Sequence, residues 1–185
     1  MEIKQLKLSE ALNKAFLKVK PTGEQIENFK TNLIQLLDRT NDTESEEFHK
    51  NLVSDFLKKT YYEPTHFINT KGRNDLVIHS GYNASTDVGV IIETKKPTNK
   101  AEMLSADKLN VKAFQELVLY YLRERITHKN VAVKYLIATN INDWFKKRIT
   151  YQSSIKNNSI KQRTYTANSG SYAFISQNKR SAAKQ

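Results

Sequence analysis

An unbroken apolar run, VGVII, occupies positions 88–92, and the charged residues Glu93 and Lys95 follow it directly. β-branched residues favour strands, and a strand without polar alternation is typical of a sheet that is covered on both faces. Pro97 cannot donate a ladder hydrogen bond, so it ends the strand. The chain is therefore predicted to build a sheet with other elements packed against both of its faces.

Apolar residues recur with helical spacing in four other stretches. One of them begins at a capping residue, Thr43 or Ser45, and is predicted to end before Tyr61. The other three cover residues 6–19, 23–39 and about 106–125.

Strands are predicted over 74–79, 88–95 and 131–139, and residues 65–70 are predicted to be extended. A helix separates the last two strands, which favours a parallel pair with a crossover. The order of elements predicts a small α/β domain, with a mixed β-sheet flanked by helices and an N-terminal helical part.

Charge is unevenly distributed over the 185 residues, whose net charge is +11. No acidic residue follows Asp143, whereas nine of the 30 basic residues do, so the part before residue 146 is nearly neutral. The segment after Trp144 also lacks a sustained apolar period. We therefore predict one folded domain over residues 1–144 and a basic, disordered tail over residues 145–185.

The chain contains no cysteine, which excludes a thiolate metal site, a disulfide framework and a thiol nucleophile. The N-terminal residues show no signal-peptide pattern, and the longest apolar run is too short to span a membrane. These features predict an intracellular, cytoplasmic protein without a membrane partner.

Charged residues at the end of the 88–95 strand suggest a chemical site. Side chains alternate along a strand, so Glu93 and Lys95 share one face while Thr94 points away. If the 74–79 strand pairs with it, Asp75 reaches the same face. Two carboxylates suit a hard divalent cation such as Mg²⁺. The competing interpretation is that these charges only mark where a buried strand emerges into water.

Two runs, GRNDLVI at 72–78 and IIETKKP at 91–97, resemble the signature of the PD-(D/E)xK nuclease superfamily. More narrowly, residues 1–144 resemble the N-terminal endonuclease domain of type IIG restriction-modification enzymes. The likeness extends to EEFHKNLVSDFLKKTYY, HFINTKGRNDLVIH, IIETKKPTNKAEM and KAFQELVLYYLRER. The resemblance implies a restriction-endonuclease-like fold and Mg²⁺-dependent hydrolysis of double-stranded DNA.

By this resemblance Asp75 and Glu93 are metal ligands and Lys95 is the catalytic lysine. Lys95 would orient the attacking water, help remove its proton, or stabilise charge on the phosphate. The family often adds an acid from an earlier helix. Glu46 lies nearer the centre of the apolar stripe of its helix than Glu47 does, so Glu46 is favoured and Glu47 is the alternative.

The resemblance also implies a polar pair on the helix after the strand. Glu116 and Tyr120 have the required spacing, and Gln115 is adjacent, so which polar residue faces the site stays open. A structural polar stripe explains these residues equally well. The basic residues near the predicted site are candidates for contacts with DNA phosphates; they are Lys71, Arg73, Lys96 and Lys100.

Type IIG enzymes continue into methyltransferase and recognition parts, whose motifs are absent from this sequence. The sequence thus favours a truncated nuclease domain, and the partners it implies are double-stranded DNA and separate methyltransferase or recognition subunits. The alternative is a catalytically inactive module that binds DNA or a protein. A small-molecule enzyme is the least favoured, because no Gly-rich phosphate loop or cofactor motif is present.

Overall fold

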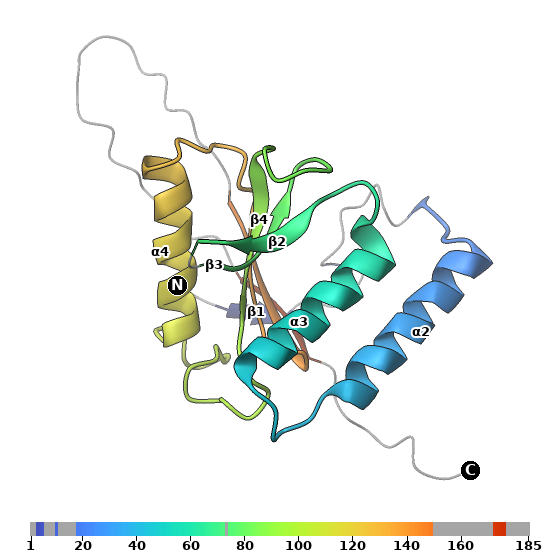
Figure 1. Cartoon of the computed structure of the whole chain (residues 1–185). Coiled ribbons are helices and arrows are strands. Elements are labelled where there is room, and N and C mark those ends of the chain that lie inside the picture. The colour runs from blue at the N-terminus through green and yellow to red at the C-terminus, as the bar shows by residue number, and fades with distance from the viewer. Residues whose placement is uncertain (1–2, 6–9, 11–17, 73, 150–171, 177–185) are drawn as a thin grey trace, which may run out of the picture.

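The computed structural model describes residues 3–5, 10, 18–72, 74–149 and 172–176 (Figure 1). The predicted helix over 6–19 lies almost wholly outside these residues. The helices are α2 (Gly23–Arg39), α3 (Glu46–Leu57), the π-helical turn η2 (Lys58–Tyr62) and α4 (Lys112–Ile126). The strands are β1 (Ile3–Gln5), β2 (Ile68–Lys71), β3 (Asn74–His79), β4 (Val88–Thr94), β5 (Tyr135–Thr139), β6 (Asp143–Arg148) and β7 (Tyr172–Ser176).

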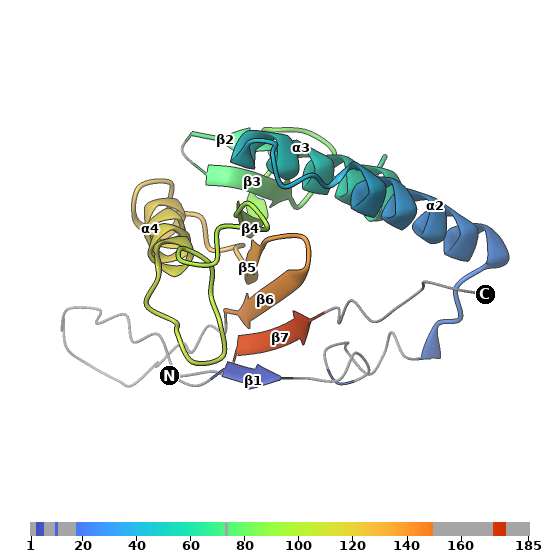
Figure 2. The ribbon, with the colours of Figure 1, turned by 90° about the horizontal axis from the view of Figure 1, so that it is seen from below.

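The strands form one seven-stranded sheet in the order β1-β7-β6-β5-β4-β3-β2. β2, β3 and β4 are antiparallel neighbours, whereas β4 and β5 run parallel on either side of the α4 crossover. β5, β6 and β7 are again antiparallel, and β1 lies parallel to β7 at the far edge (Figure 2). The predicted mixed sheet with helices is confirmed, as is the parallel pair that flanks α4.

Each face of the sheet carries its own apolar core. Val77 and Ile91 pair across β3 and β4 and pack with Leu117 of α4 on one face. Leu76 and Ile92 pair at the next position and pack with α2 and α3 on the other face. Side chains alternate along a strand, so the continuous apolar run of β4 fills both cores at once. Figure 2 shows α4 on one side of the strands and the α2–α3 pair on the other.

The two helices of the second layer begin at side-chain caps. Thr22 forms a reciprocal capping box with Gln25 at the start of α2. Ser45, one of the two predicted caps, accepts a hydrogen bond from the Phe48 amide at 3.1 Å and starts α3. α3 ends at Leu57, before Tyr61 as predicted, and the π-helical turn η2 follows it through Tyr62.

Two element boundaries near the crossover differ from those predicted. α4 begins at Lys112 rather than near residue 106, because the preceding residues form an irregular loop that buries Met103, Leu104 and Val111 in the α4-face core. Apolar burial in this loop outweighs local helix propensity. β5 begins at Tyr135 rather than at residue 131.

The predicted domain boundary at residue 144 falls inside a strand. β6 runs from Asp143 to Arg148, and Phe145 is 2% exposed in the α4-face core. β7 then adds a strand against β6. The rest of the predicted tail, residues 150–171 and 177–185, lies outside the described residues. No helix in the described ranges has both the length and the apolar character needed to cross a bilayer.

Candidate active site

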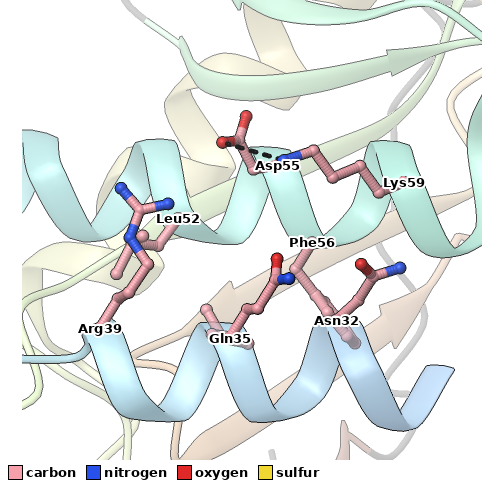
Figure 3. A pocket seen from close by; sticks show the side chains of 8 residues that line it. Asn32, Gln35, Arg39, Leu52, Asp55, Phe56 and Lys59 are labelled. Atoms are coloured by element: carbon pink, nitrogen blue, oxygen red, sulfur yellow. Dashed lines mark ion pairs between the residues drawn. The ribbon is translucent and has the colours of Figure 1, made fainter. Parts of the chain in front are cut away.

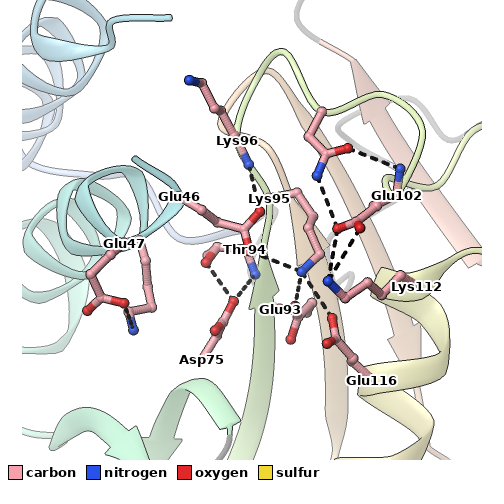
Figure 4. Close-up of polar contacts among 12 residues, drawn as sticks. Glu46, Glu47, Asp75, Glu93, Thr94, Lys95, Lys96, Glu102, Lys112 and Glu116 are labelled. Carbon is pink, nitrogen blue, oxygen red and sulfur yellow. Dashed lines mark hydrogen bonds and ion pairs between the residues drawn. The ribbon is translucent and has the colours of Figure 1, made fainter. Parts of the chain in front are cut away.

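Asp75 and Glu93 lie at the open end of the β3–β4 hairpin. Leu76 and Ile92 are the last registered pair of the two strands, and Asp75 and Glu93 are the next residues beyond it. Glu93 is 1% exposed, while Asp75 is half-buried. Figure 4 shows both carboxylates beside the end of β4. The structure thus brings together the two acids that the sequence selected.

Lys95 is the point on which three carboxylates converge. Its Nζ lies 2.6 Å from Glu93 Oε1, 3.0 Å from Glu116 Oε2 and 3.2 Å from Glu46 Oε1 (Figure 4). These acids come from β4, α4 and α3, so the site joins both layers to the central strand. With Asp75 they form an acidic cluster of four carboxylates, defined here as Glu46, Asp75, Glu93 and Glu116. The Lys95 ammonium, whose side chain is only 2% exposed, contacts three of the four.

The carboxylate of Asp75 is held by the residue between Glu93 and Lys95. Asp75 Oδ2 accepts a hydrogen bond from the Thr94 amide at 2.9 Å and another from the Thr94 hydroxyl at 2.8 Å. Strict alternation predicted that Thr94 points away from the site. That prediction is wrong for its hydroxyl, because the regular pairing of β4 with β3 ends at Ile92, two residues before Thr94, which is the last residue of β4.

Burial and charge set the protonation of the two innermost groups. Burial, then the charge of Asp75 and a hydrogen bond with Glu116, raise the pKa of Glu93 to about 9, against the opposing effect of Lys95. Burial alone would lower the pKa of Lys95, but its hydrogen bonds and charge interactions with the carboxylates raise it above the ordinary value. At neutral pH Lys95 is therefore a cation, and Glu93 holds a proton in the metal-free protein.

α4 contributes two further groups one turn apart. Burial opposes ionisation of Glu116, but hydrogen bonds with Glu93 and Lys95 outweigh it and lower the pKa of Glu116. Tyr120 is 6% exposed, and burial with the nearby charges of Glu93 and Glu116 raises its pKa to about 12. Tyr120 thus presents a neutral phenol to the acidic cluster.

One atom of the cluster fits a divalent cation. Glu93 Oε2 is buried and has no hydrogen-bond partner among the described residues. A buried carboxylate oxygen without a donor is costly, and a hard cation satisfies it. No set of three metal-ligating side chains occurs within the described ranges. The Lys95 ammonium lies where Glu46, Glu93 and Glu116 meet. Asp75 and Glu93 Oε2 are the oxygens that could hold such an ion, since neither Glu93 Oε2 nor Asp75 contacts the ammonium.

Two alternatives left open by the sequence lie outside the cluster. Gln115 is exposed and donates to Asn110 Oδ1 at 2.9 Å, so Glu116 is the residue that faces the site. Glu47 is 65% exposed and pairs with Lys50, so Glu46 is the α3 acid that reaches Lys95.

The predicted DNA-contacting residues are scattered. Lys71 forms an ion pair at 3.0 Å with the buried Glu124 of α4, so its ammonium is engaged. Lys96 uses its amide to reach Glu46 Oε2 at 3.4 Å while its side chain extends away from Lys95 (Figure 4). Lys100 is exposed in the loop before α4. Arg73 lies outside the described residues.

Sequence reasoning missed a polar contact at the rim. Glu102 accepts from Asn99 at 3.1 Å and pairs with Lys112 at 3.3 Å, joining the loop to the first turn of α4 beside Glu116 (Figure 4). Only the Asn99–Glu102 spacing hints at this loop structure in the sequence. The contact of Thr94 with Asp75 was missed as well. Its only signal in the sequence is a hydroxyl residue between Glu93 and Lys95.

A pocket lies elsewhere, between α2 and α3 (Figure 3). Asn32, Gln35 and Phe56 line it, together with the ion pair of Asp55 and Lys59, whose N and O atoms are 3.9 Å apart. None of its lining residues belongs to the acidic cluster.

The proton on Glu93 predicts a pH-dependent stability. Because its pKa of about 9 exceeds the ordinary 4.5, the folded protein binds a proton that the unfolded chain releases. This stabilisation is complete below pH 4.5 and is lost as the pH rises toward 9. In EDTA, the unfolding free energy of the wild type minus that of Glu93→Gln should fall between pH 5 and 8, by at most about 1.4 kcal/mol per pH unit. Urea denaturation measures it, and a constant difference contradicts the assignment.

Residues 6–179 match the family model described as "Domain of unknown function (DUF7149)". The match continues through most of the basic segment after residue 144. Comparisons with curated proteins and with solved structures give no match.

Proposed function

We propose that this chain, which belongs to the DUF7149 family, is a Mg²⁺-dependent endonuclease that hydrolyses phosphodiester bonds of double-stranded DNA. The proposal includes a restriction-endonuclease-like core and kinship with the endonuclease domain of type IIG restriction-modification enzymes. Its support is the mixed sheet, with the antiparallel β3–β4 hairpin beside the parallel β4–β5 pair, and the acidic cluster at the end of β4.

Glu93 carries the proposal. Its carboxylate is 1% exposed, with one oxygen on the Lys95 ammonium and the other without a partner among the described residues. A purely structural ion pair would satisfy both oxygens, because an unpaired buried acceptor costs about 1–3 kcal/mol. Glu93 is a buried acid with one oxygen that lacks a hydrogen-bond partner, and a second acid, Asp75, lies beside it. This combination indicates a site that binds a cation.

Asp75 and Glu93 would hold the metal, with Glu46 as the third acid. When bound, Mg²⁺ supplies a polarised phosphoryl oxygen and a water of lowered pKa. Lys95 holds a positive charge at the same point, and Glu93, Glu116 and Glu46 fix its ammonium in place. The chain thereby keeps a preorganised cation where negative charge develops on a phosphate during hydrolysis.

DNA is the polymer that suits this site. Lys96 and Lys100 follow β4 on the loop before α4, where they can contact phosphates next to the cleaved bond. Such contacts position a duplex without reading its sequence. Target choice and DNA modification are assigned to separate recognition or methyltransferase subunits.

A plasmid assay tests the proposal. Purified protein incubated with supercoiled plasmid and Mg²⁺ is expected to produce nicked and linear DNA whose ends carry 5′-phosphates, and EDTA should stop the reaction. Ligation of the products without prior kinase treatment checks the ends. Intact plasmid over the range from 1 to 10 mM Mg²⁺ or Mn²⁺, with correctly folded protein, would overturn the proposal.

One observation favours the alternative, a catalytically inactive module that binds DNA or a partner protein. Lys95 is only 2% exposed and its ammonium contacts three carboxylates, so a cation of the protein itself already occupies the centre of the acidic cluster. In the same assay, a gel shift of the DNA without nicking identifies this module.

A further inference from the structure

We infer that Thr94 is a positioning residue that presents Asp75 to the metal. This inference rests on the proposed function, because it gives Thr94 a role in the same site. Thr94 lies between Glu93 and Lys95 in the sequence, and it donates its hydrogen bonds to Asp75. Nothing in its own strand requires a hydroxyl at this position, since a strand favours any β-branched residue.

The contact uses both donors of Thr94 on one oxygen. The amide and the hydroxyl lie 2.9 and 2.8 Å from Asp75 Oδ2. Among the described residues, no hydrogen bond to Asp75 Oδ1 occurs. One oxygen of the carboxylate is thus fixed by the protein, and the other is left without a protein donor among the described residues, as is Oε2 of Glu93.

Thr94 is itself rigidly placed. It pairs with Thr139 of β5, and the next amide, that of Lys95, donates to Thr139 O at 2.8 Å. Its side chain is 1% exposed, and χ1 of a β-branched residue is strongly restricted. Asp75, in contrast, is only the second residue of β3, three positions after Gly72, whose φ is +63°. The Thr94 hydroxyl therefore fixes the Asp75 carboxylate relative to the central strands β4 and β5.

Hydrogen bonds that orient the first ligands of a metal typically change its affinity by about 10–100-fold. Thr94→Val keeps the shape and the amide but removes the hydroxyl. We expect Mn²⁺ to bind this variant about 10-fold more weakly or worse, whereas Thr94→Ser retains the hydroxyl and should stay within about 3-fold of the wild type.

Isothermal titration of the full chain with Mn²⁺ alone, without DNA, measures this effect. Thr139→Val is the matched control, because Thr139 is also fully buried, is paired with Thr94, and uses its hydroxyl on the Ile141 amide at 3.0 Å instead of on Asp75. It should lower the melting temperature and leave Mn²⁺ affinity unchanged. If Thr94→Val does not fold, Thr94→Ala removes the same hydroxyl from a smaller side chain, with the same expected loss.

Asp75→Asn distinguishes a failure of the role inferred for Thr94 from a failure of the proposed metal site. If Asp75→Asn loses Mn²⁺ affinity and Thr94→Val binds like the wild type, the role of Thr94 is overturned and the metal site stands. If Asp75→Asn binds Mn²⁺ like the wild type, the metal site and the inference both fail. Addition of Thr94→Val to Asp75→Asn should cause no further loss, because Thr94 acts through Asp75. A further 10-fold loss in the double variant would assign Thr94 a separate structural effect and overturn the inference.

Discussion

Glu93→Gln is expected to reduce Mg²⁺-dependent plasmid cleavage by about 10³-fold or more while the protein stays folded. Glutamine keeps the shape of the side chain and an oxygen for the Lys95 ammonium, which lies 2.6 Å from Oε1. It removes the negative charge that would hold a cation at the partnerless Oε2. The rate of loss of supercoiled plasmid at saturating Mg²⁺ measures the effect.

Glu47→Gln is the matched control for this variant. Glu47 is the neighbouring α3 acid that the sequence left as an alternative to Glu46, and its side chain is 65% exposed outside the acidic cluster. It should cleave at the wild-type rate. Wild-type cleavage by Glu93→Gln would remove the proposed site, whereas loss of cleavage in Glu47→Gln would move the helix contribution away from Glu46.

Lys95→Met is expected to abolish cleavage and also to destabilise the metal-free protein by about 1–3 kcal/mol at pH 7, because it leaves the carboxylates that contact the ammonium without their donor. Glu116 and Glu46 lose a charged partner at 3.0 and 3.2 Å. Without the ammonium that lowers its pKa, Glu116 binds a proton more readily, so the loss of stability should shrink at pH 5. Urea denaturation in EDTA at the two pH values, beside the plasmid assay, measures both effects.

Lys50→Met provides the comparison for Lys95→Met. Lys50 is also buried, with an exposed fraction of 8%, but its partner Glu47 is exposed and regains water when the lysine is removed. Its ion pair should therefore contribute about 0–1 kcal/mol, and cleavage should be retained. Equal destabilisation by the two substitutions would show that Lys95 has no special electrostatic role in the cluster.

The part of the site that the sequence could identify is the part encoded locally. Asp75, Glu93 and Lys95 lie on one hairpin, where strand alternation and pairing bring them to one face. The strand 74–79 was predicted with its observed limits, and 88–95 within one residue, because their apolar pattern is strong and Pro97 marks an end. Ser45 was among the predicted caps for the same reason, since capping is a local hydrogen bond.

The sequence misjudged the segment after Trp144. The polar and basic composition of this segment does not predict a strand, yet β6 forms there. Pairing with β5 and burial of Phe145 stabilise it. Lys146 shows how such a strand tolerates charge, since its ammonium lies 5.6 Å from the centroid of the Tyr135 ring on the neighbouring strand.

By itself, then, the sequence determined the mixed sheet covered on both faces, the β3–β4 hairpin, and the three residues at its end, since these follow from alternation, branching and punctuation within short segments. Only the tertiary structure decided between Glu46 and Glu47, between Glu116 and Gln115, and gave Thr94 its contact with Asp75. Those choices depend on how far α3 and α4 rotate about their axes as they pack on the sheet, and on where β4 leaves it. Packing of distant segments sets these quantities, and no local pattern encodes them.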